Sequence, residues 1–310
     1  MLKRFEVENF KGFKERLIFD LQAREYEFNK NLVVNGIVNK GIIYGKNGIG
    51  KSNLGIALFD IVLHLTDKER MNPIYLTEYL NLDSEKPYAE FKYIFMLGDD
   101  EVIYEYKKKD AYYLIEESLT INNSRVLFYN YFEKKENFVD KNLVGNLQIE
   151  LLDNKLSIIK YIYRNTPTNQ ESPLYKMMIF VENMLWYRGL SEGNTYCGFS
   201  NLEWQLANGV HELMAVFPTK KKAPFMSIAS TGTKSLFLYF FWSVAAFNKI
   251  SFLFIDEFDA FFHYESAENI VLRLNCNKNF QTLLTSHNTY LMQNKLTRPD
   301  CCYIMTQNKI

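Results

Sequence analysis

The sequence predicts an α/β protein with an antiparallel β subdomain and an inserted helical lobe. Short apolar segments at 41–44, 252–255 and 282–285 each end at a polar motif, which is typical of strands in a parallel sheet. Between residues 89 and 132, aromatic and β-branched segments alternate with turn residues, as in an antiparallel meander. A helical pattern covers residues 148–217.

The first part of the chain predicts strands and one helix. Residues 2–7, 17–21 and 32–34 have strand patterns, and residues 41–44 form a short buried strand that leads directly into a glycine-rich loop. Residues 51–65 form a helix, because their apolar side chains recur at helical spacing. These side chains are Leu54, Ala57, Leu58, Ile61, Val62 and Leu65.

The meander and the lobe follow. The meander strands are expected at 89–97, 101–107, 112–121 and 125–132. In the lobe, Ser172 and Pro173 form a cap and first-turn pair that opens a helix.

Two apolar runs, 177–187 and 236–247, are expected to be core helices. Both are shorter than the roughly 18 residues that a membrane span needs. We therefore expect no membrane partner.

These patterns divide the chain into three parts. Residues 1–147 form the first half of the core with the meander, residues 148–222 form the helical lobe, and residues 223–310 form the second half of the core. The lobe is inserted into the core, because strands of the core pattern resume after it.

The composition of the chain excludes few classes of function. The chain has 36 basic and 36 acidic residues, so its net charge favours neither nucleic acid nor a membrane surface. Its four cysteines form no CxxC pair and follow no secretory segment, which is typical of reduced thiols and a cytoplasmic location.

Residues 45–52, Gly-Lys-Asn-Gly-Ile-Gly-Lys-Ser, match the phosphate-binding P-loop in full. The segment follows an expected strand and precedes an expected helix, which is the context that the motif requires. Glycines let backbone N–H groups face the phosphates, and the helix N-terminus favours negative charge. Lys51 would contact the β- and γ-phosphates, and Ser52 would offer its hydroxyl to Mg²⁺. The expected nucleotide-binding residues are Gly45, Lys46, Asn47, Gly48, Ile49, Gly50, Lys51, Ser52 and Asn53.

Asp256 and Glu257 follow the apolar strand 252–255. Ligands bind at the carboxyl ends of strands in such sheets, so this acidic pair is expected to meet the nucleotide. Asp256 would orient the magnesium shell, and Glu257 would deprotonate the attacking water. Acidic pairs after apolar strands also occur as ordinary solvated loops, and the P-loop favours the functional interpretation.

His287 ends a third short strand, in the sequence Thr285-Ser286-His287-Asn288. A histidine at this position can hydrogen-bond the γ-phosphate and sense its loss. An isolated histidine is more commonly a structural residue, but its place at a third strand end favours the functional interpretation.

Ser230, Thr231, Gly232 and Ser235 open a helix ahead of the acidic pair. Amides and hydroxyls at a helix start form an anion site, yet the P-loop already holds the phosphates of the same copy. We therefore expect this segment to bind the phosphate of a second copy. Its plainer interpretation is an ordinary Ser/Thr cap.

The four motifs, in this order, resemble those of ABC-type ATPase heads. The opening segment, Glu8-Asn9-Phe10-Lys11-Gly12-Phe13, is similar to that of the SMC, RecF and OLD-like ATPases. The ending, with His287, Leu291 and Arg298-Pro299-Asp300, resembles small AAA-type ATP-binding proteins of bacterial anti-phage systems, including the ATPase component of PARIS-like systems.

This resemblance implies roles for further residues. Ser230 and Gly232 would contact the γ-phosphate of a partner copy in a head-to-tail dimer, and Asp259 would be the aspartate of the D-loop. Asn47 would help hold the water or the γ-phosphate, and Lys11 would approach the nucleotide. It also implies ATP and Mg²⁺ as ligands, and a homodimer or higher oligomer. A separate effector protein, for which a nuclease is one candidate, would be the partner.

The chain departs from this pattern in two ways. Residues 89–97 contain no glutamine for a Q-loop, and no long heptad pattern interrupts the chain as in SMC proteins. Relatives often carry a short polar tail after the last strand, whereas this sequence stops at Ile310.

Two other functions stay open at this point: a RecF-like DNA-maintenance ATPase, and an ATP-dependent scaffold with little turnover. Short lysine clusters at 107–109, 134–135 and 220–222 are usually solvated turns, and 220–222 is the one to test for nucleic acid. The histidines show no metal-ligand spacing, and no nuclease motif is visible in the chain.

Overall fold

The computed structural model describes residues 1–68, 76–133, 136–145, 147, 153–167, 169–188, 201–207, 210–230, 232–234, 236–237, 249–260 and 263–306.

A five-stranded parallel sheet forms the core. Its strands lie in the order β11-β15-β16-β5-β17, and every neighbouring pair is parallel. β5, β15 and β16 are buried along their whole length, as expected for central strands of a parallel sheet, and each contains a short apolar run. The bounds are β5 (Lys40–Tyr44), β11 (Met184–Arg188), β15 (Phe252–Asp256), β16 (Gln281–Ser286) and β17 (Cys302–Ile304).

A seven-stranded antiparallel sheet packs beside the core. Its order is β10-β9-β8-β7-β6-β1-β2, so the predicted meander is extended by the N-terminal strands on one side. Buried and half-buried residues alternate along β6, as expected for a sheet with one covered face. The bounds are β1 (Leu2–Glu8), β2 (Leu17–Asp20), β6 (Ala89–Leu97), β7 (Asp100–Lys108), β8 (Leu114–Ile121), β9 (Ser124–Asn130) and β10 (Phe138–Val139).

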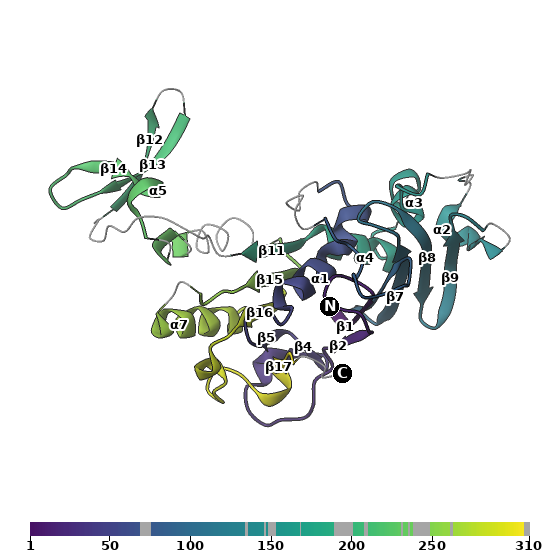
Figure 1. The fold of residues 1–310 in the computed structure, drawn as a ribbon, viewed down its shortest axis with the longest axis horizontal. Coiled ribbons are helices and arrows are strands. Elements are labelled where there is room, and N and C mark those ends of the chain that lie inside the picture. The colour runs from purple at the N-terminus through teal and green to yellow at the C-terminus, as the bar shows by residue number, and fades with distance from the viewer. Residues whose placement is uncertain are drawn as a thin grey trace.

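Helix α1 (Lys51–Leu65) lies between the two sheets, as Figure 1 shows. On the core side, the helix at Gly55 meets the ring of Phe254 on β15. On the other side, the hydroxyl of Tyr93 on β6 donates to the carbonyl oxygen of Ala57 at 2.9 Å. The helix that starts at the P-loop therefore joins both sheets.

The remaining elements are small. Helices α2 (Lys141–Val144), α3 (Ile158–Asn165) and α4 (Pro173–Glu182) lie beside the antiparallel sheet, and α7 (Tyr264–Asn275) connects β15 to β16. The Ser172 hydroxyl accepts from the N–H of Tyr175 at 3.2 Å, which confirms the predicted cap. The described residues also include a two-stranded sheet and short 3-10 helices: β3 (Val33–Val34), β4 (Ile37–Val38), η1 (Lys30–Leu32), η4 (Thr289–Leu291) and η5 (Pro299–Cys301).

Only part of the predicted helical lobe is helical. Helices α3 and α4 agree with the prediction, but the run 177–187 is not one core helix, because α4 ends at Glu182 and β11 begins at Met184. Beyond β11, the chain forms the antiparallel sheet β12 (Asn201–Ala207), β13 (Val210–Val216) and β14 (Lys222–Pro224), followed by α5 (Phe225–Ile228). The second apolar run lies mostly outside the described residues; of it, 236–237 are helical.

Candidate functional site

Three of the four motifs lie at one edge of the core sheet. The P-loop follows β5, Glu257 follows β15 and His287 follows β16, and these three strands are neighbours. Ser286 is in register with Tyr44, and Leu284 is in register with Ile255. The strands therefore end at nearly the same level, so that the motifs meet at their carboxyl ends.

The P-loop backbone favours glycine at Gly45, Gly48 and Gly50. Gly48 has φ of 78°. Gly50, the residue before α1, has φ of 110°, a conformation that side chains disfavour. A Cβ on Gly45 would lie 2.8 Å from Cγ2 of Ile49 and 3.2 Å from the carbonyl oxygen of Met305. The loop is therefore closed tightly against the end of β17.

The Lys51 side chain is bound to the backbone of this loop. Its ammonium donates to the carbonyl oxygens of Gly45 at 2.6 Å and Lys46 at 3.1 Å. The N–H groups of the first turn of α1 have no acceptor within the helix, and no side chain caps them at Gly50. Ammonium and amides together form a site suited to a phosphate.

The other P-loop residues differ in exposure. Lys46, Asn47 and Gly48 are exposed, whereas Ile49, Ser52 and Asn53 are half-buried. A Cβ on Gly12 would lie 3.1 Å from Nδ2 of Asn53, so the opening segment 9–13 packs directly beside the P-loop helix.

Lys11 does not point its charge at the P-loop. Its ammonium donates to the carbonyl oxygen of Thr77 at 2.8 Å and lies 5.8 Å from the centre of the Phe10 ring. Partial burial lowers the pKa of Lys11. The role that the resemblance implied for this lysine gains no support from its contacts.

The acidic pair is held by β16. Asp256 is fully buried, and its Oδ1 accepts from the Thr285 hydroxyl at 2.7 Å. Glu257 is half-buried, and its N–H donates to the same hydroxyl at 2.7 Å. The sequence motif included Thr285, but sequence reasoning assigned it no role. The sequence offered a signal, because two hydroxyl residues, Thr285 and Ser286, end β16, the strand that pairs with β15.

The turn after Glu257 carries Asp259, the predicted D-loop aspartate. Its side chain is buried, and Oδ2 accepts from the Ser286 hydroxyl at 2.7 Å. Its other oxygen, Oδ1, has no hydrogen-bond partner among the described residues. A buried carboxylate oxygen of this kind calls for a donor from outside the described chain.

His287 projects from the same segment. The Ser286 hydroxyl accepts from the N–H of Asn288 at 2.9 Å, which fixes the backbone on both sides of the histidine. The His287 side chain itself is exposed. It is therefore accessible at the sheet edge, as a γ-phosphate sensor would have to be.

The fourth motif lies apart from the other three. Figure 1 shows α5, which ends just before Ser230, beyond β11 and away from α1. The Ser230 hydroxyl accepts from the N–H of Thr233 at 3.1 Å, so it caps the helical residues 232–234 that include Gly232. Thr231 and Ser235 lie outside the described residues.

The two residues predicted to bind magnesium carry oxygen atoms of the kind that this ion prefers. Ser52 and Asp256 supply hard oxygen ligands, which Mg²⁺ prefers. Within the described ranges, no group of three or more His, Cys, Asp or Glu side chains could hold a metal alone. Mg²⁺ commonly binds through one or two protein oxygens together with substrate phosphates, and this donor set matches that pattern.

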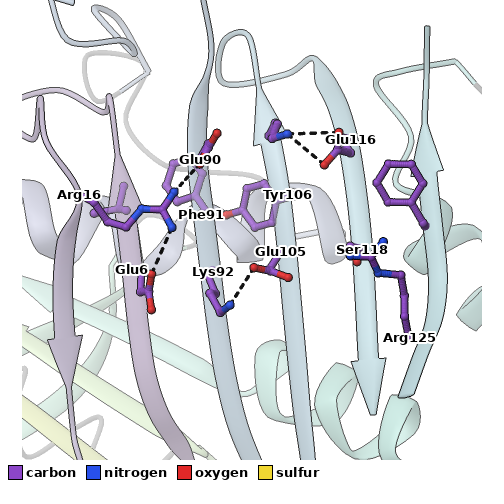
Figure 2. A pocket seen from close by; sticks show the side chains of 13 residues that line it. Glu6, Arg16, Glu90, Phe91, Lys92, Glu105, Tyr106, Glu116, Ser118 and Arg125 are labelled. Atoms are coloured by element: carbon purple, nitrogen blue, oxygen red, sulfur yellow. Dashed lines mark hydrogen bonds and ion pairs between the residues drawn. The ribbon is translucent and has the colours of Figure 1, made fainter. Parts of the chain in front are cut away.

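A hollow of about 280 Å³ lies on the outer face of the antiparallel sheet (Figure 2), and no residue of the four motifs lines it. Its charges neutralise one another: Lys92 pairs with Glu105 at 2.9 Å, and Lys107 with Glu116 at 3.2 Å. We therefore assign no ligand to it.

Part of the chain is similar in sequence to a known domain family. Residues 221–293 match the family described as "AAA domain, putative AbiEii toxin, Type IV TA system". The matched stretch is about a quarter of the chain and contains the acidic pair and His287, but not the P-loop. No curated protein matches the chain in sequence.

Solved structures of SMC heads show weak similarity. They are the SMC head domain from Thermotoga maritima (18% identity, TM-score 0.42), the SmcHead bound to the C-winged helix domain of ScpA (17%, 0.49), and an Smc head domain with an extended coiled coil bound to the C-terminal domain of ScpA, derived from Pyrococcus furiosus (16%, 0.48). Each alignment covers 94% of this chain and 91% of the other.

The described helices include none that is both long and apolar enough to span a membrane.

The strand neighbours and the loop between β5 and α1 confirm the predicted class of fold, an α/β P-loop fold with an antiparallel β subdomain.

Proposed function

We propose that the chain is an ABC-type ATPase that binds ATP with Mg²⁺ at the P-loop and hydrolyses it. The observation that carries this proposal is the convergence of three motifs at the ends of β5, β15 and β16. A phosphate site, an acidic pair and an accessible histidine at one sheet edge match the needs of phosphoryl transfer to water.

Each residue has one task in this reaction. The first-turn amides of α1 and the Lys51 ammonium bind the phosphates, and Lys51 exchanges its carbonyl contacts for phosphate oxygens. Ser52 and Asp256 would hold magnesium, which would supply positive charge beside the phosphates. Glu257 accepts the proton of the attacking water, and His287 donates a hydrogen bond to the γ-phosphate.

The site is completed by a second copy of the chain. Ser230 and Gly232 follow α5, which lies away from α1 in Figure 1, and this supports a role in closing the site of another copy. Oδ1 of Asp259, which has no hydrogen-bond partner within the described part of the chain, also suits a donor from a second copy. ATP would therefore hold two copies together, and hydrolysis would release them.

The same cycle would control a separate effector protein in anti-phage defence. Support comes from the matched family, whose description includes a putative AbiEii toxin of a Type IV toxin–antitoxin system. Phage plating on cells that carry the wild-type gene in its native neighbourhood, compared with Lys51→Ala, tests this part. Equal plating on both strains would contradict it, and ATP-dependent DNA binding with a steep salt slope would favour DNA maintenance.

Glu257→Gln tests the hydrolysis step. Loss of the general base should lower the rate of phosphate release by about 100-fold or more, while binding of a fluorescent ATP analogue persists. The control is Glu265→Gln, an exposed residue in the first turn of α7. Wild-type turnover in the Glu257→Gln variant would show that another group is the base.

A further inference from the structure

Thr285 holds the turn that contains the acidic pair by three hydrogen bonds. Its hydroxyl donates to Oδ1 of Asp256 at 2.7 Å and accepts from the N–H of Glu257 at 2.7 Å. Its carbonyl oxygen accepts from the N–H of Phe258 at 3.2 Å. Thr285 is itself fully buried, so water does not compete for these bonds.

The chemistry of the two neighbours requires a hydroxyl here. An ionised carboxylate can only accept a hydrogen bond, and a backbone N–H can only donate one. A hydroxyl does both at once, and in this structure the single hydroxyl of Thr285 serves Asp256 and Glu257 together. Valine has the same shape but can satisfy neither neighbour, so Oδ1 of Asp256 and the N–H of Glu257 would each lose this hydrogen bond.

The backbone at Glu257 needs this support. Glu257 has φ of 51°, in the left-handed region, which is strained for a residue other than glycine. The backbone conformation sets the direction of the Glu257 side chain. The N–H of this same strained residue makes the hydrogen bond to Thr285. The strain persists because hydrogen bonds to Thr285 on β16 hold the turn in this conformation.

We infer that Thr285 is a positioning residue for the hydrolysis reaction: its hydroxyl sets the alignment of Glu257 relative to Asp256. This inference rests on the proposed ATPase function. It is specific to Thr285, because the next hydroxyl, that of Ser286, donates to Asp259 instead.

Thr285→Val and a matched control variant test the inference. Removal of a positioning contact commonly costs about 10- to 100-fold, so kcat should fall by that factor while the Kd for a fluorescent ATP analogue changes by less than about 3-fold. Thr282→Val is the control, because Thr282 is a second buried threonine on β16 whose hydroxyl serves Lys40 away from the site. It should keep wild-type kcat. Equal kcat in Thr285→Val and wild type, or an equal fall in Thr282→Val, would overturn the inference.

A second pair keeps the test valid if Thr285→Val unfolds. Thr285→Ser and Thr285→Ala both lack the methyl group and differ only in the hydroxyl, so the serine variant should retain turnover and the alanine variant should lose it. Equal turnover in the pair would overturn the inference.

A double variant separates positioning from general structural damage. If Thr285 acts through Glu257, adding Thr285→Val to Glu257→Gln should lower the residual rate no further. Losses that multiply would overturn the inference while leaving the ATPase proposal intact. If Glu257→Gln does not reduce the phosphate release of the wild type, both the inference and the ATPase proposal would be overturned.

Discussion

At the scale of single residues, Gly55 lies where α1 touches β15. A Cβ at this position would lie 2.6 Å from Cε1 of Phe254, whose ring is fully buried. We expect Gly55→Ala to destabilise the protein by about 1–2 kcal/mol, because overpacking costs more than the roughly 1 kcal/mol that alanine gains over glycine in a helix. Urea unfolding measures the change.

The partner substitution Phe254→Leu provides the control. A smaller side chain leaves room for the new methyl group, so the double variant should lose less stability than the two single variants predict by addition. A Gly55→Ala variant as stable as wild type would show that the Phe254 ring moves aside without cost.

At the scale of elements, α1 is anchored to the antiparallel sheet by buried polar groups. Asp60 accepts hydrogen bonds from the Tyr79 and Tyr106 hydroxyls at 2.9 Å and from the Lys108 ammonium at 3.0 Å. One turn later, Nε2 of His64 is hydrogen-bonded to the Tyr104 hydroxyl at 2.9 Å. The P-loop helix is thus joined to β7 through both side chains.

This network predicts a pH dependence of stability. Burial, and secondly the charge of Lys108, lower the pKa of His64 well below 6.5. Below pH 6.5 the unfolded chain binds a proton that the folded chain excludes, so the free energy of unfolding should fall as pH drops from 7 to 5. The slope from this one group is at most about 1.4 kcal/mol per pH unit.

His64→Gln isolates that contribution, because glutamine keeps hydrogen-bonding capacity but does not titrate. Urea unfolding at several pH values should give a flatter profile for this variant than for wild type. Parallel profiles would show that His64 is not responsible.

Elements with a clear local pattern could be predicted, and two short strands without one could not. The spacing of Leu54 to Leu65 gave α1 with the observed bounds, since a helix depends on local periodicity. β11 was missed because its apolar residues continue the pattern of α4 with only Asn183 between them. β17 was missed because three residues carry no period, and only its pairing with β5 makes it a strand.

The site shows the same division. Motif order predicted the P-loop, the acidic pair and His287 at one sheet edge, because parallel strands align their carboxyl ends. The role of Thr285 depends on which strand lies next to β15, and that neighbour cannot be read from local sequence. Lys11 illustrates the converse, since its motif was recognised but its ammonium bonds elsewhere.

At the scale of the whole molecule, the proposed shared site can be tested by mixing two inactive variants. Lys51→Ala inactivates the P-loop of one copy, and Ser230→Arg inactivates the segment 230–235 of the other, here called the signature. In a mixed dimer, one of the two sites combines an intact P-loop with an intact signature. Equal mixing should therefore restore about a quarter of wild-type phosphate release, because half of the dimers are mixed and half of their sites are whole.

Each variant alone, at the same total concentration, is the control and should stay inactive. If the mixture is no more active than the separate variants, the two motifs do not act across copies.

The position of β5 has a consequence for how the protein is made. β5 lies between β16 and β17, which come last along the described chain. The ribosome therefore releases the P-loop long before either neighbour of its strand exists. The hairpins of residues 89–130 pair strands that are adjacent in sequence, so they can fold during translation. We therefore expect the nascent chain to fold its β subdomain first, and the proposed nucleotide site to form only after β16 and β17 have been made.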